Sequence, residues 1–374
     1  MNVLSYVHLR NIYGSTGAGR VARLLTEHMA CEEKTDVHIL ADAGDHRRIL
    51  PKVGDPWTSF SYHLFDDDTS RQQARWLLTH RPSAESYWPD VQIMHCTMES
   101  YVPTHRCRLV ATVHDAAYFE SGAHPARWST FRQRLKWRFL YGTLSRKVDM
   151  FHTVSNFSAD RLATFFPSIR SRLRVVYNGV PPRFFEPVSA VGERYLEETQ
   201  LRDVPFVLLP GGLNYRKNAA LVLEAWPKLL QHSPDLVLVV AGQSEPEFAE
   251  RARAFASIRL TGFVYDDVLC SLYHAAQAVW VPSLYEGFGI PVVEAMACGA
   301  PVVASDCSSL PEVAGDAAIL VPPGSADAHI EALRMVIEDS TTRNRLREKG
   351  KIRSRQFTWA HAAGALRQHF SNLL

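Results

Sequence analysis

Long apolar runs are absent from this sequence. No window approaches the roughly 18 uninterrupted apolar residues that a membrane-spanning helix needs. The first residues, MNVLSYVHLRNIYG, also lack the basic stretch and the apolar stretch that together make a secretory signal. Both absences argue against an exported or membrane-spanning protein. We therefore expect a cytoplasmic protein. Any association with the cell membrane is expected to be peripheral and at its inner face.

Paired cysteines and excess charge are also lacking. The six cysteines stand at positions 31, 96, 107, 270, 298 and 307, without a C-x-x-C pair. Scattered cysteines inside apolar runs behave as small hydrophobic residues and suit a reducing compartment. The 41 Lys and Arg nearly balance the 39 Asp and Glu, for a net charge of +2. This balance gives no basic surface that would indicate nucleic acid as a partner.

The length and the apolar pattern indicate two α/β domains. A chain of 374 residues exceeds the size at which a single core usually stops growing. In the second half, runs that are apolar throughout alternate with helix-like segments, as in parallel sheets covered on both faces. The runs are PFVLLPGG, DLVLVVAG, AVWVPS, PVVAS and AAILVPP, and the helices are expected at 218–231, 246–256, 266–276 and 291–298.

The first half repeats the alternation less regularly. Expected strands are NVLSYVHL, DVHIL, DVQIMHC, RLVATVHD and DMFHTV, and expected helices are 17–30, 128–144 and 155–166, the last with Ser155 or Ser158 as N-cap. Residues 41–90 carry no recognisable pattern, and 181–204, rich in proline and charge, is expected to be a linker. We predict a doubly wound α/β domain over residues 1–182 and another over 183–357.

The stretch VPSLYEGFGIPVVEAMACGAPVVAS carries the strongest chemical signal. A strand is followed by a glycine loop with Glu286, by a helix with Glu294 that ends at Gly299, and by another strand. A helix N-terminus attracts phosphate, and glycines let the backbone approach a ligand closely. The two carboxylates suit hydroxyl groups on either side of that phosphate. The alternative is that Glu286 is a solvated loop residue and Glu294 a surface residue.

This stretch closely resembles the donor-binding motif of the family 4 retaining glycosyltransferases. The resemblance implies the GT-B fold, in which two Rossmann-like domains face each other across a cleft and a C-terminal helix, here at about 358–374, crosses back to the first. It further implies that Glu294 holds the ribose of a nucleotide sugar and that Glu286 contacts the transferred sugar. The implied donor-binding residues are Gly17, Gly212, Arg216, Lys217, Glu286, Gly287, Phe288, Gly289, Ile290 and Glu294.

Arg216 and Lys217 stand just before a predicted helix, in LPGGLNYRKNAALVLEAW. Cations there would stabilise the charge that accumulates on a departing diphosphate; by themselves they would more often be a solvated pair. The family carries G-R where this sequence has Gly211-Gly212, so the resemblance assigns the arginine's role to Arg216.

Two segments of the first half also resemble the family. GSTGAGR is ordered G-x-x-G-x-G, which does not match the dinucleotide fingerprint G-x-G-x-x-G. It is either a tight turn or, as the family implies, the glycine loop that closes over donor phosphate and acceptor, with Gly17 in contact. His114 ends the strand ATVHD, and the family's H-D at this place makes it an expected active-site residue.

The segment 124–147 is basic and aromatic and contains no acidic residue. Such a helix either lies on an anionic bilayer, gripping a lipid diphosphate, or is a solvated helix packed by its aromatic residues. The residues assigned to acceptor or membrane contact are Arg127, Arg132, Arg134, Lys136 and Arg138. The run Asp66-Asp67-Asp68 is expected to be a solvated turn, and no metal or other cofactor is expected.

Together with these patterns, the resemblance implies a retaining hexosyltransferase with His114, Lys217, Arg216 and Glu286 in catalytic roles. The H-D and R-K-N variants resemble O-antigen mannosyltransferases, so GDP-mannose is the first expected donor, among GDP- and UDP-linked sugars. The acceptor is expected to be a glycan or polyprenyl-diphosphate-linked glycan of surface polysaccharide biosynthesis. The alternatives are a GT-B synthase or phosphorylase that makes a soluble disaccharide or glycoside, and a non-catalytic two-domain sugar-binding protein.

Overall fold

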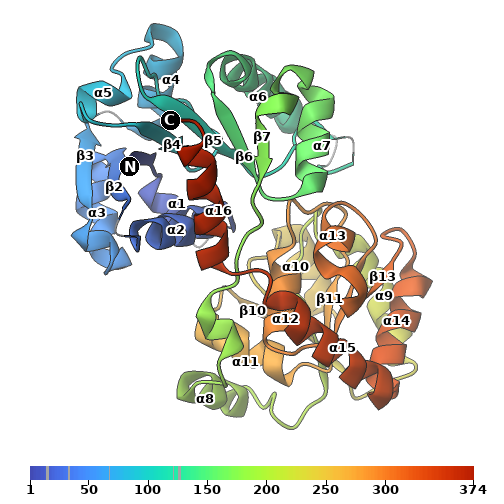
Figure 1. Cartoon of the computed structure of the whole chain (residues 1–374). Coiled ribbons are helices and arrows are strands. Elements are labelled where there is room, and N and C mark those ends of the chain that lie inside the picture. The colour runs from blue at the N-terminus through green and yellow to red at the C-terminus, as the bar shows by residue number, and fades with distance from the viewer. Residues whose placement is uncertain (14–16, 33, 67, 121, 125–127) are drawn as a thin grey trace. The chain divides into compact units, whose positions relative to one another are not determined.

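The computed structural model describes residues 1–13, 17–32, 34–66, 68–120, 122–124 and 128–374. The chain forms two compact units, each built around a parallel sheet (Figure 1). Unit 1 comprises Met1–Phe119, Arg127–Gly179 and Trp359–Leu374, and unit 2 comprises Glu120–Ala126 and Val180–Thr358. Among the helices of the described part of the chain, none combines the length and the apolar character needed to cross a membrane.

Unit 1 contains a parallel sheet with the strand order β3-β2-β1-β4-β5-β6-β7. Its strands are β1 (Asn2–Tyr6), β2 (Asp36–Asp42), β3 (Ser61–Phe65), β4 (Ile93–Cys96), β5 (Arg108–Val113), β6 (Met150–Thr153) and β7 (Leu173–Val175). Its helices are α1 (Leu9–Tyr13), α2 (Gly17–Ala30), α3 (Ala43–Val53), η1 (Trp57–Ser59), α4 (Thr69–Thr79), α5 (Ala84–Tyr87), α6 (Trp128–Lys147), α7 (Asn156–Phe165), η2 (Pro167–Arg172) and α16 (Trp359–Ser371).

Unit 2 contains a second parallel sheet, with the order β10-β9-β8-β11-β12-β13. Its strands are β8 (Phe206–Pro210), β9 (Val237–Ala241), β10 (Ile258–Gly262), β11 (Ala278–Val281), β12 (Val302–Ser305) and β13 (Ala318–Val321). Its helices are η3 (Pro182–Phe185), α8 (Ala190–Glu198), α9 (Ala219–Leu230), α10 (Pro246–Arg253), α11 (Asp266–Ala275), α12 (Ile290–Ala297), α13 (Leu310–Ala314), η4 (Gly315–Ala317), α14 (Ala326–Glu338) and α15 (Ser340–Ser354).

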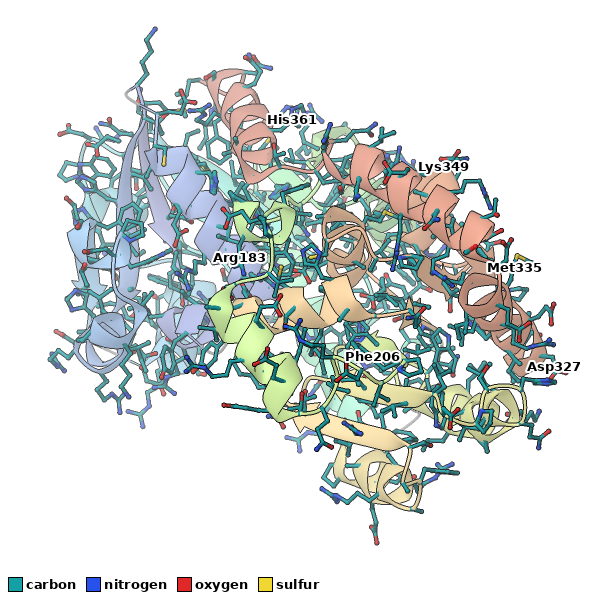
Figure 2. The ribbon with its side chains drawn as sticks, turned by 90° about the horizontal axis from the view of Figure 1, so that it is seen from below. Arg183, Phe206, Asp327, Met335, Lys349 and His361 are labelled. Atoms are coloured by element: carbon teal, nitrogen blue, oxygen red, sulfur yellow. The ribbon has the colours of Figure 1, made fainter. Side chains whose placement is uncertain are left out.

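The central strands are apolar throughout because helices cover both of their faces. Every residue of β8, β9, β11 and β12 is buried. Phe206, on β8, is completely buried; Figure 2 labels it among the side chains of unit 2. The prediction of two doubly wound α/β domains is confirmed.

The segment 181–204, predicted to be a linker, has regular structure. It contains η3 and α8, and Ser189 caps α8 by accepting a hydrogen bond from the backbone N–H of Gly192 at 3.2 Å. Helix α8 packs against α11 within unit 2. Gly192 makes this packing close, because a Cβ there would lie 2.7 Å from Cβ of Ser271.

Candidate active site

Except for Gly17, the expected donor residues lie near the point where the strand order of unit 2 reverses. Strands β8 and β11 are neighbours, although β9 and β10 separate them in sequence. At such a point the connections leave to opposite sides, and a ligand crevice opens at the carboxyl ends of the strands. The loop after β8 carries Lys217, and the loop after β11 carries Glu286. A backbone hydrogen bond of 2.8 Å from Leu284 to Arg216 joins the two loops.

Lys217 and Glu286 form a close ion pair. The Nζ of Lys217 lies 2.6 Å from Oε1 of Glu286, and the two side chains are only 16% and 9% exposed. Ser283 also donates to Oε1, at 2.8 Å, while Ser309 donates to the Glu286 carbonyl at 2.9 Å. These bonds hold the carboxylate and the ammonium in one place. The interpretation of Glu286 as a solvated loop residue is therefore wrong.

The surroundings keep Glu286 ionised. Burial by itself raises the pKa of this carboxyl group, but the charges of Lys217 and Arg216, and hydrogen bonds from Lys217 and Ser283, outweigh it. The net result is a pKa of Glu286 below its ordinary value. A fixed negative charge at this position can accept hydrogen bonds from sugar hydroxyls without first losing a proton.

Glycines after β8 make room for the lysine. Gly211 has φ +94°, and a Cβ at this position would lie 2.7 Å from Cε of Lys217. Gly212 has φ +73°, and its Cβ would lie 2.0 Å from the carbonyl oxygen of Gln243. The Gly211-Gly212 pair, which departs from the family's G-R, thus lets the backbone turn under the Lys217 side chain.

Helix α12 begins at the glycine loop as predicted. Gly289, its N-cap, has φ +99°, a conformation that L-residues rarely adopt. Glu294 lies on this helix and is only 2% exposed, so it is not a surface residue. Tyr273 of α11 donates a hydrogen bond of 3.3 Å to its Oε2. The remaining predicted donor contacts, Gly287, Phe288 and Ile290, lie in the same turn and first helical residue.

Arg216 lies in the turn before α9 beside Lys217, and its guanidinium is 5.9 Å from the centre of the Tyr285 ring. The aromatic ring therefore supports the arginine next to the loop that carries Glu286. Unit 2 thus brings together Gly212, both cations, both carboxylates and the α12 N-terminus.

His114 and Gly17 belong to unit 1. His114 follows β5, and its backbone N–H donates to Oε1 of Glu99 at 2.7 Å, while its carbonyl accepts a hydrogen bond from Ser158 at 3.2 Å. Burial raises the pKa of Glu99, with the opposing influence of His114 and of the backbone N–H groups too small to reverse it. Glu99 was not among the predicted residues, although its place just after the buried strand β4 indicates a residue near the site. Gly17 is the first residue of α2.

The residues assigned to acceptor or membrane contact differ in exposure along α6. Arg132, Lys136 and Arg138 are exposed, whereas Arg134 is half-buried and donates from Nε to the carbonyl of Tyr118 at 2.8 Å. Arg127 lies outside the described residues. Of the three aspartates predicted to form a solvated turn, Asp66 and Asp68 are exposed, and Asp67 is outside the described residues. Asp68 also caps α4 by accepting a hydrogen bond from the Arg71 N–H at 2.8 Å.

Two protein-family models match the chain, one in its first half and one in its second half. Glycosyltransferase Family 4 matches residues 15–184, and Glycosyl transferases group 1 matches residues 193–353. The chain belongs to the family 4 glycosyltransferases. The second match includes the glycine loop, Lys217 and both carboxylates. The site in unit 2 therefore lies within the region that this glycosyltransferase shares with its family.

Two relatives of this glycosyltransferase are mannosyltransferases. It is 30% identical over 270 residues to the O-antigen chain mannosyltransferase B of Escherichia coli, a match that covers 69% of each chain. It is 30% identical over 271 residues to the MMP alpha-(1->4)-mannosyltransferase of Mycolicibacterium hassiacum, covering 68% of this chain and 63% of that relative.

Solved structures confirm the GT-B fold of this glycosyltransferase. Sucrose-phosphate synthase of Thermosynechococcus elongatus superposes with a TM-score of 0.77 at 20% identity, covering 100% of this chain and 99% of the other. Anabaena HepE, solved in complex with UDP, gives a TM-score of 0.72 at 18% identity and covers 100% of both chains.

Proposed function

We propose that this protein is a retaining mannosyltransferase that uses GDP-mannose and extends a lipid-linked glycan in surface polysaccharide biosynthesis. The observation that carries the proposal is the buried Lys217–Glu286 pair beside the N-terminus of α12, with Glu294 one turn further along that helix. The mannosyltransferase relatives support mannose as the transferred sugar. The residues at the site supply positioning and charge, and the proposed reaction requires no metal.

The proposed chemistry follows from the charges. The amides at the start of α12, together with Lys217 and Arg216, face the diphosphate and stabilise the negative charge that grows on it as the glycosidic bond breaks. Glu286 accepts hydrogen bonds from the sugar hydroxyls, and Glu294 accepts them from the ribose. The acceptor hydroxyl attacks the face that the phosphate leaves, and the phosphate oxygen takes its proton. His114 is proposed to face the donor sugar from unit 1.

The first experiment is thermal unfolding with a panel of GDP, UDP, ADP and TDP and their sugar conjugates. A ligand that binds only the folded protein raises its unfolding temperature. We expect GDP and GDP-mannose to give the largest increase, and Glu294→Gln to reduce the increase for both. A larger increase in unfolding temperature with UDP-sugars would show that the base is uracil rather than guanine. No increase with any nucleotide would contradict the donor site.

Acceptor use separates the proposal from a synthase of soluble products. The apolar and basic surface of α6, described below, supports a lipid-linked acceptor. Transfer of radiolabelled mannose into a chloroform-soluble polyprenyl-diphosphate glycan is the expected result. Equal transfer to a soluble sugar or sugar phosphate, with no lipid dependence, would instead favour the synthase.

A further inference from the structure

Three possible metal ligands lie close together at the C-terminal end of α12. Cys270 and His274 lie one turn apart on α11, and Cys298 is the C-cap of α12. The two sulfur atoms are 3.7 Å apart, and both lie within 4.8 Å of a ring nitrogen of His274. Both cysteines are buried and free, and His274 is half-buried. Since 28 residues separate the cysteines, the sequence gives no recognisable metal motif.

These distances fit tetrahedral zinc. With Zn–S bonds of about 2.3 Å and a tetrahedral angle, two sulfur ligands stand about 3.8 Å apart. The observed sulfur separation of 3.7 Å is close to this value, and one ring nitrogen of His274 lies within 4.8 Å of both sulfurs. We propose that Cys270, His274 and Cys298 bind one zinc ion as a Cys₂His site, with a water molecule in the fourth position.

One hydrogen bond orients the imidazole, whereas the two that the thiols donate, from Cys298 to the Phe184 carbonyl at 3.3 Å and from Cys270 to the Arg183 carbonyl at 3.7 Å, would be given up when the metal binds. His274 Nε2 lies 3.2 Å from the carbonyl oxygen of Glu186, and donation along this bond leaves the lone pair on Nδ1 for the metal. Zinc supplies the charge that allows both sulfurs to be thiolates at once.

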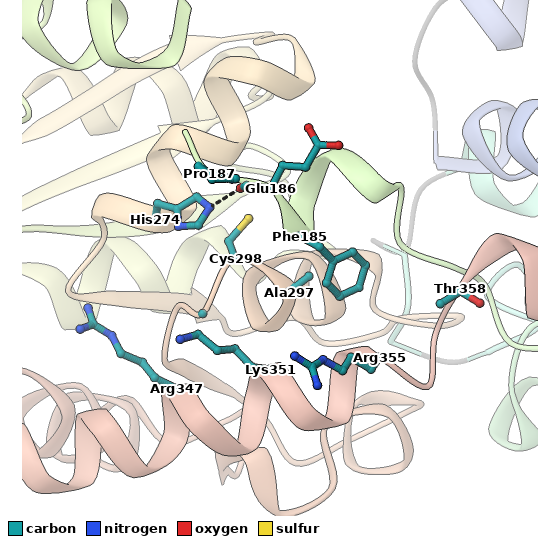
Figure 3. A pocket seen from close by; sticks show the side chains of 11 residues that line it. Phe185, Glu186, Pro187, His274, Ala297, Cys298, Arg347, Lys351, Arg355 and Thr358 are labelled. Atoms are coloured by element: carbon teal, nitrogen blue, oxygen red, sulfur yellow. Dashed lines mark hydrogen bonds between the residues drawn. The ribbon is translucent and has the colours of Figure 1, made fainter. Parts of the chain in front are cut away.

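A pocket gives the metal a way in. It has a volume of about 750 Å³ and is lined by His274 and Cys298 on one side and by residues of α15 on the other. In Figure 3, Arg347 and Lys351 project from α15 toward this space, and a dashed line joins His274 to Glu186. The two thiolates balance the charge of a divalent ion, so the metal adds no net charge beside these cations.

The proposed metal fastens the end of the donor-binding helix. Cys298 donates its backbone N–H to the carbonyl of Glu294 at 3.0 Å, and Tyr273, which donates to the Glu294 carboxylate, neighbours His274 in sequence. The ion would therefore tie α11 to α12 one turn from the carboxylate assigned to the ribose. The ion would hold these two helices together whichever donor or acceptor is used.

Cobalt substitution tests the site directly. The full chain is purified with a reducing phosphine, stripped with a chelator and titrated with Co²⁺. We expect one ion per chain, with thiolate-to-cobalt charge-transfer absorption and the intense visible bands of tetrahedral cobalt, both removed by added Zn²⁺. Zn²⁺ should also raise the unfolding temperature of the stripped protein.

Matched variants locate the ion. Cys270→Ser, Cys298→Ser and His274→Gln should each weaken metal affinity at least about tenfold. His274→Cys should keep tetrahedral binding, and Cys31→Ser, which removes an exposed thiol, should leave it unchanged. Far-UV circular dichroism checks that each variant is folded. A weak octahedral spectrum, no binding by the reduced wild type, or loss of binding in Cys31→Ser would overturn the proposal. A disulfide between Cys270 and Cys298 that the phosphine fails to reduce in the metal-free protein would also overturn the proposal.

Discussion

At the scale of single residues, the site depends on the fact that Lys217 and Glu286 share one buried position. Each charge would be costly to bury alone, and removing one partner leaves the other uncompensated. In this pair the carboxylate sets the position of the ammonium, and the ammonium keeps the carboxylate ionised. A change at either residue therefore alters the chemistry of both.

Replacing Lys217 with Ala should reduce kcat by a factor on the order of 10² while donor affinity falls much less, because the ammonium acts mainly on charge that develops in the transition state. Steady-state kinetics and equilibrium nucleotide binding measure the two effects. Lys228→Ala, at an exposed lysine in the last turn of α9 that pairs with Glu224, should change neither. Equal losses in turnover and affinity would refute the transition-state role.

The sequence predicts the identity of these residues but not the contact between them. Nothing in the chain signals that a lysine after β8 reaches a glutamate 69 positions later, since this depends on the adjacency of β8 and β11. The same holds for Cys270 and Cys298. Residue-level chemistry was predictable where one continuous motif carried it, and unpredictable where the fold joins two segments.

At the scale of elements, the strands that sequence analysis missed lie at sheet edges. Strands β3 and β7 are the two edges of the sheet of unit 1, and β10 is one edge of the other. These three strands are only partly covered, and polar residues interrupt their apolar runs. The remaining edge strand, β13, is apolar throughout and was predicted. Strand β3, SYHLF, has one fully buried residue, and β7, LRV, has none. The central strands, buried on both faces, were predicted because burial leaves them uniformly apolar.

The outer face of helix α6 carries both exposed apolar and exposed basic residues. Phe131, Leu135 and Phe139, spaced four residues apart, are 54%, 62% and 62% exposed. Exposed basic residues lie between them, as noted above. Trp137, by contrast, stacks on Tyr118 with ring centres 5.2 Å apart and contributes to the core. The helix thus combines an inner aromatic face with an outer face that is apolar and basic, which is typical of contact with an anionic bilayer.

The double variant Arg132→Glu and Arg138→Glu should abolish binding to liposomes that contain anionic lipid, with each basic residue near the surface worth about 1 kcal/mol. Flotation of the protein with vesicles measures the bound fraction. Arg134 is left intact because it holds the Tyr118 carbonyl. Arg345→Glu, an exposed arginine on α15, is the matched control. If the double variant still binds the liposomes, the basic residues of α6 do not contact the membrane and the helix is a solvated one.

At the scale of the whole molecule, each unit encloses neutral histidines. In unit 1, one consistent arrangement has His95 donating to Thr112 at 2.9 Å, Thr112 to His152 at 3.0 Å, and His152 to the Val176 carbonyl at 3.3 Å. In unit 2, Trp280 donates to His329 at 3.0 Å. Burial lowers the pKa of His152 and of His329 to about 4.

Both units should therefore lose stability together as the pH falls. Between the ordinary histidine pKa near 6.5 and the lowered values, the unfolded chain takes up protons that the folded chain refuses. Each such histidine lowers the free energy of unfolding by about 2 kcal/mol at about pH 5. Calorimetry from about pH 7 to about pH 5 should show the unfolding temperature falling. His329→Gln should make this fall shallower, whereas His105→Gln, at an exposed histidine, should not. A pH-independent unfolding temperature would contradict the assignment.

The position of α16 has a consequence for how the chain is made. This helix follows all of unit 2 in the sequence, yet it packs against α2 of unit 1, with Phe370 fully buried and its ring centre 5.4 Å from that of His95. During translation, the ribosome releases the strands of unit 1 first and the helix that covers them only after the whole of unit 2. Unit 1 must therefore wait, with an apolar face uncovered, through the synthesis of about 180 residues at about 5–20 residues per second.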